Sequence, residues 1–309
     1  MGVRTDLASE AVAGRADLPG IRVSEEHPED GIAVTRVFID TEQAARELGK
    51  SVGSFVTIDA PKLTENDQLY REKVEQVLKT ELTGLISCLK KGDTVLVIGL
   101  GNRTITPDAL GPLVVDKVAV SRHVTQYLPE LVDERVRPVC AIAPGVLGVT
   151  GIETGEVVLG LVEKIKPALV IAIDALASRS TEKISTSVQL TDTGVQPGSG
   201  LGNGRMQLTK ETLGVPVIAI GVPTVVHAST ISQDAVSLLL NEMGEKEENS
   251  AQLLELVGKV VSEKIGPLVV TPKDIDTIVD RSADLIATGI DLTLHDLNQE
   301  ELRRFLTGS

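Results

Sequence analysis

Several residue types on which common functions depend are scarce in this chain. It contains no tryptophan, and aromatic residues make up 2% of its 309 residues. A surface for stacking nucleic-acid bases is not expected, because such surfaces are built from aromatic side chains. Basic residues number 30 against 44 acidic ones, which gives a net charge of −14. Since phosphate backbones are bound by clustered basic residues, we expect no direct contact with nucleic acid.

Cysteine and long apolar runs are also scarce. The two cysteines, Cys88 and Cys140, lie in apolar surroundings. We expect both to be reduced core residues, with a single disulfide as the weaker alternative. No apolar run reaches the roughly 18 residues of a membrane-spanning helix, and the first residues lack the apolar segment of a signal peptide. These absences predict a cytoplasmic protein with no membrane partner.

The apolar residues that are present predict alternating strands and helices. A hydrophobic content of 42% is sufficient for a sizeable core. Strand-like apolar runs occupy residues 35–39, 55–58, 94–98, 136–142, 168–174, 183–190 and 215–220. Helical patterns cover residues 64–91, 109–121 and 153–165, with further helices expected from about 225 and from 272. This alternation is typical of an α/β fold with a doubly wound mixed sheet.

Individual residues refine the limits of these elements. Pro138 indicates that the strand ending at residue 142 lies at an edge or carries a bulge. Thr64 and Thr271 are suited to cap helices, and Pro223 is expected to open one.

The ends and loops of the chain suggest a simple domain organisation. Residues 1–35 are polar and irregular, so we expect an N-terminal arm that contributes little to the core. Residues 36–309 are expected to form a single α/β domain. Within it, residues 194–204 are rich in glycine and predict a loop, and residues 242–250 are charged and predict a surface excursion.

Two acidic residues occupy the positions where this architecture places sites. The strand at 94–98 is followed by a small-residue loop, Gly99–Pro112, which carries Asp108, and the strand at 168–174 ends on Asp174. In open α/β sheets, sites form at the carboxyl ends of the strands. Two acids placed there could share a proton and act as acid and base. Alternatively, Asp108 favours a helix N-terminus and Asp174 is a turn or cap residue.

Other chemistries remain as alternatives. The Gly99–Gly101 pair suggests a dinucleotide loop, but Thr104 replaces the third glycine of that fingerprint. A metal could be held by Asp108, Asp174 and a histidine such as His227, although no dense histidine or cysteine cluster occurs.

The serines near Asp174 raise a further possibility. Ser178 or Ser180 could be a nucleophile only if a base lay nearby. Arg179, which lies between them, could orient a carboxylate.

The chain resembles the germination (spore) proteases of endospore-forming bacteria. The matching segments are Val3–Ala8, Gly99–Asn102, Thr106–Pro112, Ala143–Val146, Ile173–Arg179, the loop around Gly198–Gly200, Gly221–Val226 and Val270–Asp276. They follow one another over nearly the whole chain. The Gly99–Asn102 loop also resembles hydrogenase maturation proteases and peptidyl-tRNA hydrolases, which implies a related, phosphorylase/hydrolase-like architecture.

The resemblance implies an endopeptidase that degrades small acid-soluble spore proteins in the spore core during germination. It implies that Asp108 and Asp174 are the catalytic aspartates and that the protein is a homotetramer made as a zymogen. We expect no metal or other cofactor, because the chain has no dense histidine or cysteine cluster and two carboxylates alone are a poor site for zinc. We expect Arg179, Gly198 and Gly200 to contact substrate. Because little precedes Val3, any self-cleavage is expected within residues 1–35, beside Glu10. The alternatives are a metal-dependent maturation-type protease and a non-catalytic peptide-binding assembly.

Overall fold

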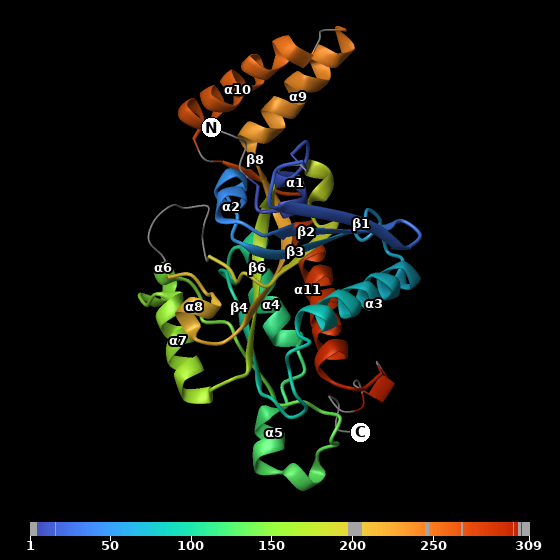
Figure 1. Ribbon diagram of the computed structural model, residues 1–309, viewed down its shortest axis with the longest axis vertical. Coiled ribbons are helices and arrows are strands. Elements are labelled where there is room, and N and C mark those ends of the chain that lie inside the picture. The colour runs from blue at the N-terminus through green and yellow to red at the C-terminus, as the bar shows by residue number, and fades with distance from the viewer. Residues whose placement is uncertain are drawn as a thin grey trace.

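Nine strands form one mixed sheet in the computed structural model (Figure 1). The structure describes residues 5–15, 17–196, 206–244, 247–266, 268–298, 300, 301 and 304, to which all counts refer. The strands are β1 (Ile21–Glu29), β2 (Ile32–Ile39), β3 (Gly53–Asp59), β4 (Val95–Gly99), β5 (Val139–Ile142), β6 (Leu169–Ser178), β7 (Ser187–Thr191), β8 (Val217–His227) and β9 (Val269–Val270). Their order is β1-β2-β3-β7-β8-β6-β4-β5, and β9 pairs with β8. Strands β8, β6, β4 and β5 are parallel, and the other pairs are antiparallel.

Helices cover both faces of the sheet, as expected for a doubly wound fold. They are α1 (Ala8–Ala11), α2 (Glu42–Leu48), α3 (Gln68–Leu85), α4 (Leu110–Lys117), α5 (Arg122–Tyr127), α6 (Leu147–Thr150), α7 (Thr154–Ile165), α8 (Lys210–Leu213), α9 (Ala228–Glu242), α10 (Glu247–Lys264) and α11 (Ile275–Leu294). Short 3₁₀ turns are η1 (Thr106–Asp108), η2 (Pro129–Leu131) and η3 (Thr181–Lys183).

Alternate residues of the central strands supply two cores. In β4, Val95 and Val97 join the cluster that packs against α3, α4 and α11. Leu96 and Ile98 point to the other face and pack in the cluster that contains Val158 of α7. Because successive side chains of a strand point to opposite faces, a strand buried on both faces is continuously apolar.

The strands expected from the sequence are present, with shifted ends. Strand β5 is an edge strand, as Pro138 predicted. Strand β8 is longer than expected, and Pro223 lies within it instead of opening a helix, which begins at Ala228. The pairing of β8 with β6 shifts register directly after Leu176↔Pro223. A bulge of this kind accommodates a residue that has no N–H for the ladder.

The predicted helix caps were wrong. Helix α3 begins at Gln68, and its cap is Asp67, whose carboxylate accepts a hydrogen bond of 3.0 Å from the N–H of Tyr70. Helix α11 begins at Ile275 after Asp274, so Thr271 does not cap it. Both true starts lie three or more residues beyond the predicted threonines.

The N-terminal region is not the irregular arm that its composition predicted. Residues 21–29 form β1, and the expected boundary at residue 35 falls inside β2, where Ile32 and Val34 are fully buried. Strand β1 was missed because only Ile21 is buried in it. An edge strand whose other side chains face solvent has no apolar alternation to reveal it.

The prediction for the cysteines was half wrong. Cys88 is exposed and Cys140 is partly buried, and both are free thiols. Burial raises the pKa of the Cys140 thiol above its ordinary value. Neither cysteine therefore stabilises the fold through a disulfide.

Two features lie away from the central sheet. Helices α9 and α10 form a hairpin that projects from one end of the molecule (Figure 1), around the charged stretch expected at 242–250.

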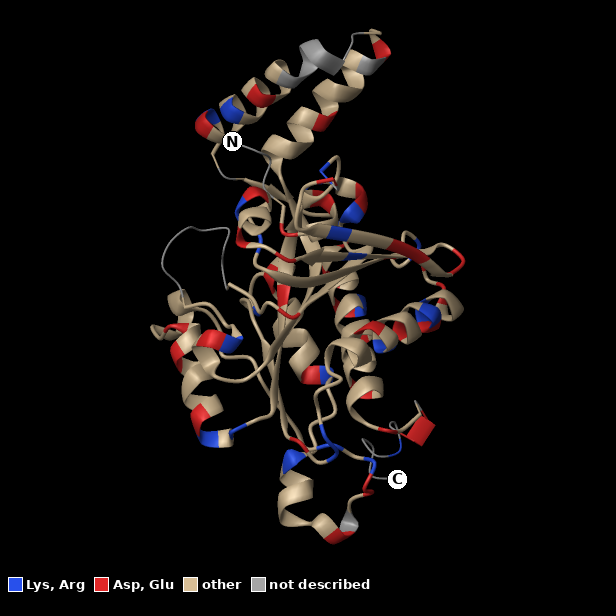
Figure 2. Ribbon diagram, viewed as in Figure 1, with Lys and Arg blue, Asp and Glu red and all other residues tan. Residues whose placement is uncertain are grey.

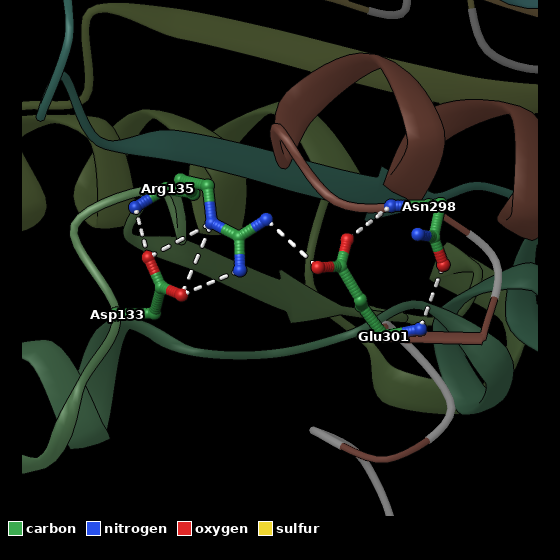
Figure 3. Close-up of polar contacts among 4 residues, drawn as sticks. All are labelled: Asp133, Arg135, Asn298 and Glu301. Atoms are coloured by element: carbon green, nitrogen blue, oxygen red, sulfur yellow. Dashed lines mark hydrogen bonds and ion pairs between the residues drawn. The ribbon is translucent and has the colours of Figure 1, made fainter.

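Near the C-terminus, Arg135 links the carboxylates of Asp133 and Glu301, while Glu301 exchanges hydrogen bonds with Asn298 (Figure 3). This network fastens the segment after α11 to the loop before β5.

In the view of Figure 2, the Lys and Arg residues of the described chain are scattered over separate elements and do not form a stripe. Among the described helices, none has the length and apolar character needed to cross a membrane.

Candidate active site

Asp174 lies at the point where one neighbour of β6 turns away. The parallel ladder between β4 and β6 ends at Gly99↔Ile173, and the N–H of Leu100 donates a 2.8 Å hydrogen bond to the carbonyl of Ile173. Strand β6 continues beyond this point beside β8 alone, with Asp174 opposite Gly221. The prediction that Asp174 ends its strand was therefore wrong, because β6 continues to Ser178. Asp174 is the first residue of β6 beyond the end of the ladder with β4. This is the kind of position at which α/β sheets bind ligands.

The loop after β4 returns Asp108 to this position. Gly101 has φ +107°, and a Cβ at Gly101 would lie 2.0 Å from the carbonyl oxygen of Asp108. Only glycine fits such a backbone conformation and such a close approach. The N–H of Asn102 donates a 2.7 Å hydrogen bond to Oδ2 of Asp108. The glycine-rich run thus folds its own acidic residue back over the end of β4.

A threonine of β8 holds the turn that carries Asp108. The hydroxyl of Thr224, which is 1% exposed, donates a 2.7 Å hydrogen bond to the carbonyl of Pro107 in η1. The carbonyl of Thr224 in turn accepts from the hydroxyl of Thr271 at 2.9 Å. Three segments far apart in the sequence therefore meet beside the candidate site.

The two carboxyl groups interact electrostatically. Burial raises the pKa of Asp174 to about 8, and the nearby carboxylates of Asp108 and, to a smaller degree, Asp6 also raise it. One hydrogen bond opposes this shift, because the N–H of Ala175 donates to Oδ1 of Asp174 at 2.9 Å. A raised pKa favours the protonated form of Asp174, which suits a proton donor.

Sequence reasoning missed two acids of the N-terminal segment. Asp6 accepts a 2.9 Å hydrogen bond from the N–H of Ala177, and Glu10 accepts hydrogen bonds from the N–H groups of Arg179 and Ser180 at 2.8 and 2.9 Å. Asp6 belongs to a segment that carried the family resemblance, but nothing in its sequence context pointed to the site. Its partner lies 171 residues further along the chain.

The other predicted site residues have varied positions. Arg179 is exposed, and its guanidinium is close enough to Asp234 of α9 to oppose the rise that burial causes in the pKa of that carboxyl. Gly198 and Gly200 lie outside the described residues. Ser178 is fully buried and donates a hydrogen bond to the carbonyl of Ser180 at 2.9 Å, so its hydroxyl is not presented as a nucleophile.

The predicted alternative of a metal site is not assembled. Among the residues that the structure describes, no group of three or more His, Cys, Asp or Glu side chains could hold a metal ion. His227 pairs with Val269 and lies six residues beyond Gly221, the partner of Asp174. At about 3.3 Å per residue, this places His227 roughly 20 Å further along β8. His227 therefore does not lie beside Asp174.

The fold and the site together define a class, an α/β protein with paired carboxyl groups at the end of a parallel ladder. Its family follows from comparison with known proteins. The family model described as germination protease matches residues 4–264. A germination protease of Caldanaerobacter subterraneus subsp. tengcongensis is 45% identical, with 99% of this chain and 98% of that protein covered.

Further relatives agree with this match. A germination protease of Clostridium tetani is 41% identical over 99% of this chain and 100% of its own length. One of Bacillus cereus is 40% identical over 95% and 94%. The chain belongs to the germination protease family, and it is an endopeptidase with a role in spore germination.

Proposed function

We propose that this endopeptidase hydrolyses small acid-soluble spore proteins in the spore core, with Asp108 and Asp174 as its catalytic residues. The observation that supports the proposal is the position of Asp174 and Asp108 at the end of β4, where burial and the charge of Asp108 raise the pKa of Asp174. A pair of acids in different states supplies both a base and an acid at one pH. The substrate class rests on the family resemblance.

The two acids have distinct roles in the proposed mechanism. Asp108, whose carboxylate accepts the N–H of Asn102, takes a proton from water as the water oxygen attacks the scissile carbonyl carbon. Asp174 donates its proton toward the carbonyl oxygen, so that a neutral tetrahedral intermediate forms. The proton held by Asp108 then passes to the leaving amine, the C–N bond breaks, and the carbonyl oxygen returns its proton to Asp174. The pair thus ends in its starting state.

The surroundings of the acids support binding of an extended peptide. Beyond Ile173, strand β6 no longer pairs with β4, and the N-terminal segment binds it next at Ala177, so the proposed substrate would lie beside the residues between these points. We place Arg179 at the rim of this site, as a residue that contacts substrate. We also propose that Gly198 and Gly200 contact the substrate.

We also propose that the protein is a homotetramer. The α9–α10 hairpin and β9 carry large exposed apolar side chains, including Leu239, Met243 and Leu256, which are 62%, 74% and 55% exposed. Large exposed apolar side chains on neighbouring elements are expected in association surfaces. Because most oligomers are symmetric assemblies of identical chains, we propose that a second copy of the chain covers these side chains.

A cleavage assay tests the proposed function. A disordered, spore-type protein is incubated with the wild type and with the Asp108→Asn and Asp174→Asn variants, each with and without a chelator. We expect each variant to lose about 10²-fold to 10⁴-fold in kcat, as when an acid or base is removed, and the chelator to change nothing. Near-wild-type cleavage by either variant would refute the aspartate pair. Loss of wild-type activity in chelator, restored by one metal, would favour the maturation-type alternative.

A further inference from the structure

The loop that follows β5 leaves the sheet at the same end as the two acids. Strand β5 runs parallel to β4, and their last pair is Ile98↔Ile142. Asp108 lies on the loop after β4, and Asp174 is the first residue of β6 beyond the ladder with β4. The carboxyl ends of three neighbouring parallel strands therefore meet here, where α/β sheets bind ligands. The proposed function uses the loop after β4 and the end of β6, but it leaves the loop after β5 without a role.

Three large apolar side chains of this loop are exposed. Leu147 and Val149 belong to α6 and Ile152 lies just before α7 (Figure 1), and their exposed fractions are 42%, 69% and 50%. None of residues 143–153 is buried, so the loop adds nothing to the core. Because removing apolar surface from water is favourable, three such side chains within six residues are suited to contact apolar groups of another molecule.

Polar contacts and a glycine hold the loop in shape without these side chains. The hydroxyl of Thr150 donates to the carbonyl of Val146 at 3.2 Å and accepts from the N–H of Ile152 at 3.1 Å. The hydroxyl of Thr154 donates to the carbonyl of Gly145 at 3.1 Å, and Gly145 has φ +79°, which favours glycine. The backbone of the loop is therefore fixed by its own hydrogen bonds, and the exposed apolar side chains are not needed to fold it.

The position of the loop fits a peptide bound beside Asp174. Beyond Ile173, the place next to β6 that β4 occupied is no longer filled by a paired strand. A peptide at that place continues the line of β4, and its other side faces the loop after β5. Neighbouring strands lie about 4.8 Å apart, so the end of β5 is roughly 10 Å from Asp174. Since an extended chain covers this distance in about three residues, a substrate reaches the loop close to its scissile bond.

We propose that Leu147, Val149 and Ile152 form an apolar subsite of the peptidase, which binds an apolar side chain of the substrate a few residues from the scissile bond. The inference rests on the proposed roles of Asp108 and Asp174. It adds the class of substrate side chain that the site selects. The subsite supplies binding and takes no part in bond cleavage, so its removal raises KM and leaves kcat nearly unchanged.

Serine substitutions test the subsite. The double variant Val149→Ser/Ile152→Ser removes its two most exposed side chains and keeps the backbone that the loop needs. Leu128→Ser is the matched control, because Leu128 is 45% exposed and lies before β5, at the opposite end of that strand. All variants are made in the full chain, and thermal unfolding and sedimentation velocity check their folding and assembly. If the double variant does not fold, Val149→Ser alone takes its place.

The first readout is cleavage of a disordered spore-type protein, whose cleavage sites are identified by mass spectrometry. For the double variant we expect KM to rise about tenfold while kcat changes less than about twofold, as when an apolar contact is lost from the bound substrate and the transition state alike. Leu128→Ser should match the wild type. An unchanged KM would overturn the proposal. A smaller assembly at unchanged KM would also overturn it and would assign this surface to contact with a second copy of the chain.

A second substrate tests the class of side chain that is bound. In this protein, serine replaces the apolar residues next to each identified cleavage site. The wild type should lose about tenfold in kcat/KM on this substrate, and the double variant should lose much less, because its contact is already absent. Equal losses in the two enzymes would overturn the proposal. If Asp108→Asn and Asp174→Asn remain active, the proposed function has failed, whereas the comparison of the two substrates still tests the subsite.

Discussion

The N–H of Asn102 donates a 2.7 Å hydrogen bond to Oδ2 of Asp108, six residues further along the chain. This contact exists because the backbone reverses at Gly101, where φ is +107°. A donor aimed at the carboxylate stabilises its negative charge, which suits a base. The position of Asp108 therefore explains the glycines of this loop, and no phosphate ligand is needed to account for them.

The Gly101→Ala variant tests this loop. We expect it to lose at least about 2 kcal/mol of unfolding free energy, because alanine is strained at this φ and its Cβ would clash with the carbonyl of Asp108. Peptidase activity should fall with it. Urea denaturation measures the loss, and Gly49→Ala is the control. Gly49 also has positive φ, +64°, but no atom lies near its Cβ position, so its loss should be smaller. Equal losses would show that contact with Asp108 is unimportant.

Asp174→Asn is expected to stabilise the fold at neutral and alkaline pH while it abolishes activity. The pKa of Asp174 is about 8 in the folded protein against an ordinary value of 3.8, so the folded state binds the proton more tightly. Its contribution to stability is complete below pH 4 and is lost as the pH rises toward 8. The asparagine variant should therefore gain on the order of 2 kcal/mol over the wild type between these limits.

Denaturation at a series of pH values checks this gain. Asp93→Asn, made far from the site, should show no comparable rise with pH. An advantage of Asp174→Asn that is the same at pH 4 and pH 8 would contradict the raised pKa.

Thr224→Val tests the attachment of η1 to β8. The change keeps the shape of the side chain but leaves the carbonyl of Pro107 without its 2.7 Å donor. We expect a loss of about 1–2 kcal/mol in unfolding free energy, as for an unsatisfied buried group, and a lower kcat because Asp108 belongs to the same turn. Thr80→Val is the control, since the exposed hydroxyl of Thr80 donates to the carbonyl of Gln76 within α3. A Thr224→Val enzyme with unchanged kcat would show that the turn is positioned without this bond.

A buried histidine far from the site should control stability in acid. His295 is 1% exposed, and burial, together with the charge of Arg137, lowers its pKa to about 4. The folded state therefore favours the neutral imidazole of His295 over the protonated one. This preference contributes stability above pH 6.5, the ordinary pKa, and the contribution is lost as the pH falls toward 4. The His295→Gln variant should lose less stability, by about 2 kcal/mol, over this interval. His27→Gln, at an exposed histidine, should behave as the wild type in the same acid titration.

The proposed tetramer makes a prediction about the α9–α10 hairpin. Replacing Leu239 and Leu256 by aspartate should reduce the assembly to smaller species without unfolding it, because both side chains are more than half exposed in the single chain. Sedimentation velocity at micromolar concentration measures the change. A wild-type monomer would refute the tetramer, and an intact double variant would place its interfaces elsewhere.

Much of the sheet and both central acids could be predicted from the sequence. Strands buried on both faces, such as β4 and β6, are continuous apolar runs. In both strands the apolar run ends where the ladder between them ends, at Gly99 and Ile173. Asp174 follows the apolar residues of β6 directly, and Asp108 lies on the loop after β4. Local residue order therefore determined the two proposed catalytic positions before any contact was known.

What only the tertiary structure decided depends on partners distant in the chain. Pro223 lies in a strand because β6 shifts register beside it, and β1 is a strand because β2 supplies its hydrogen bonds. The contact between Asp6 and Ala177 joins backbone groups and the carboxylate of Asp6 across 171 residues of sequence. No local residue pattern predicts so distant a contact, because only folding brings the two segments together.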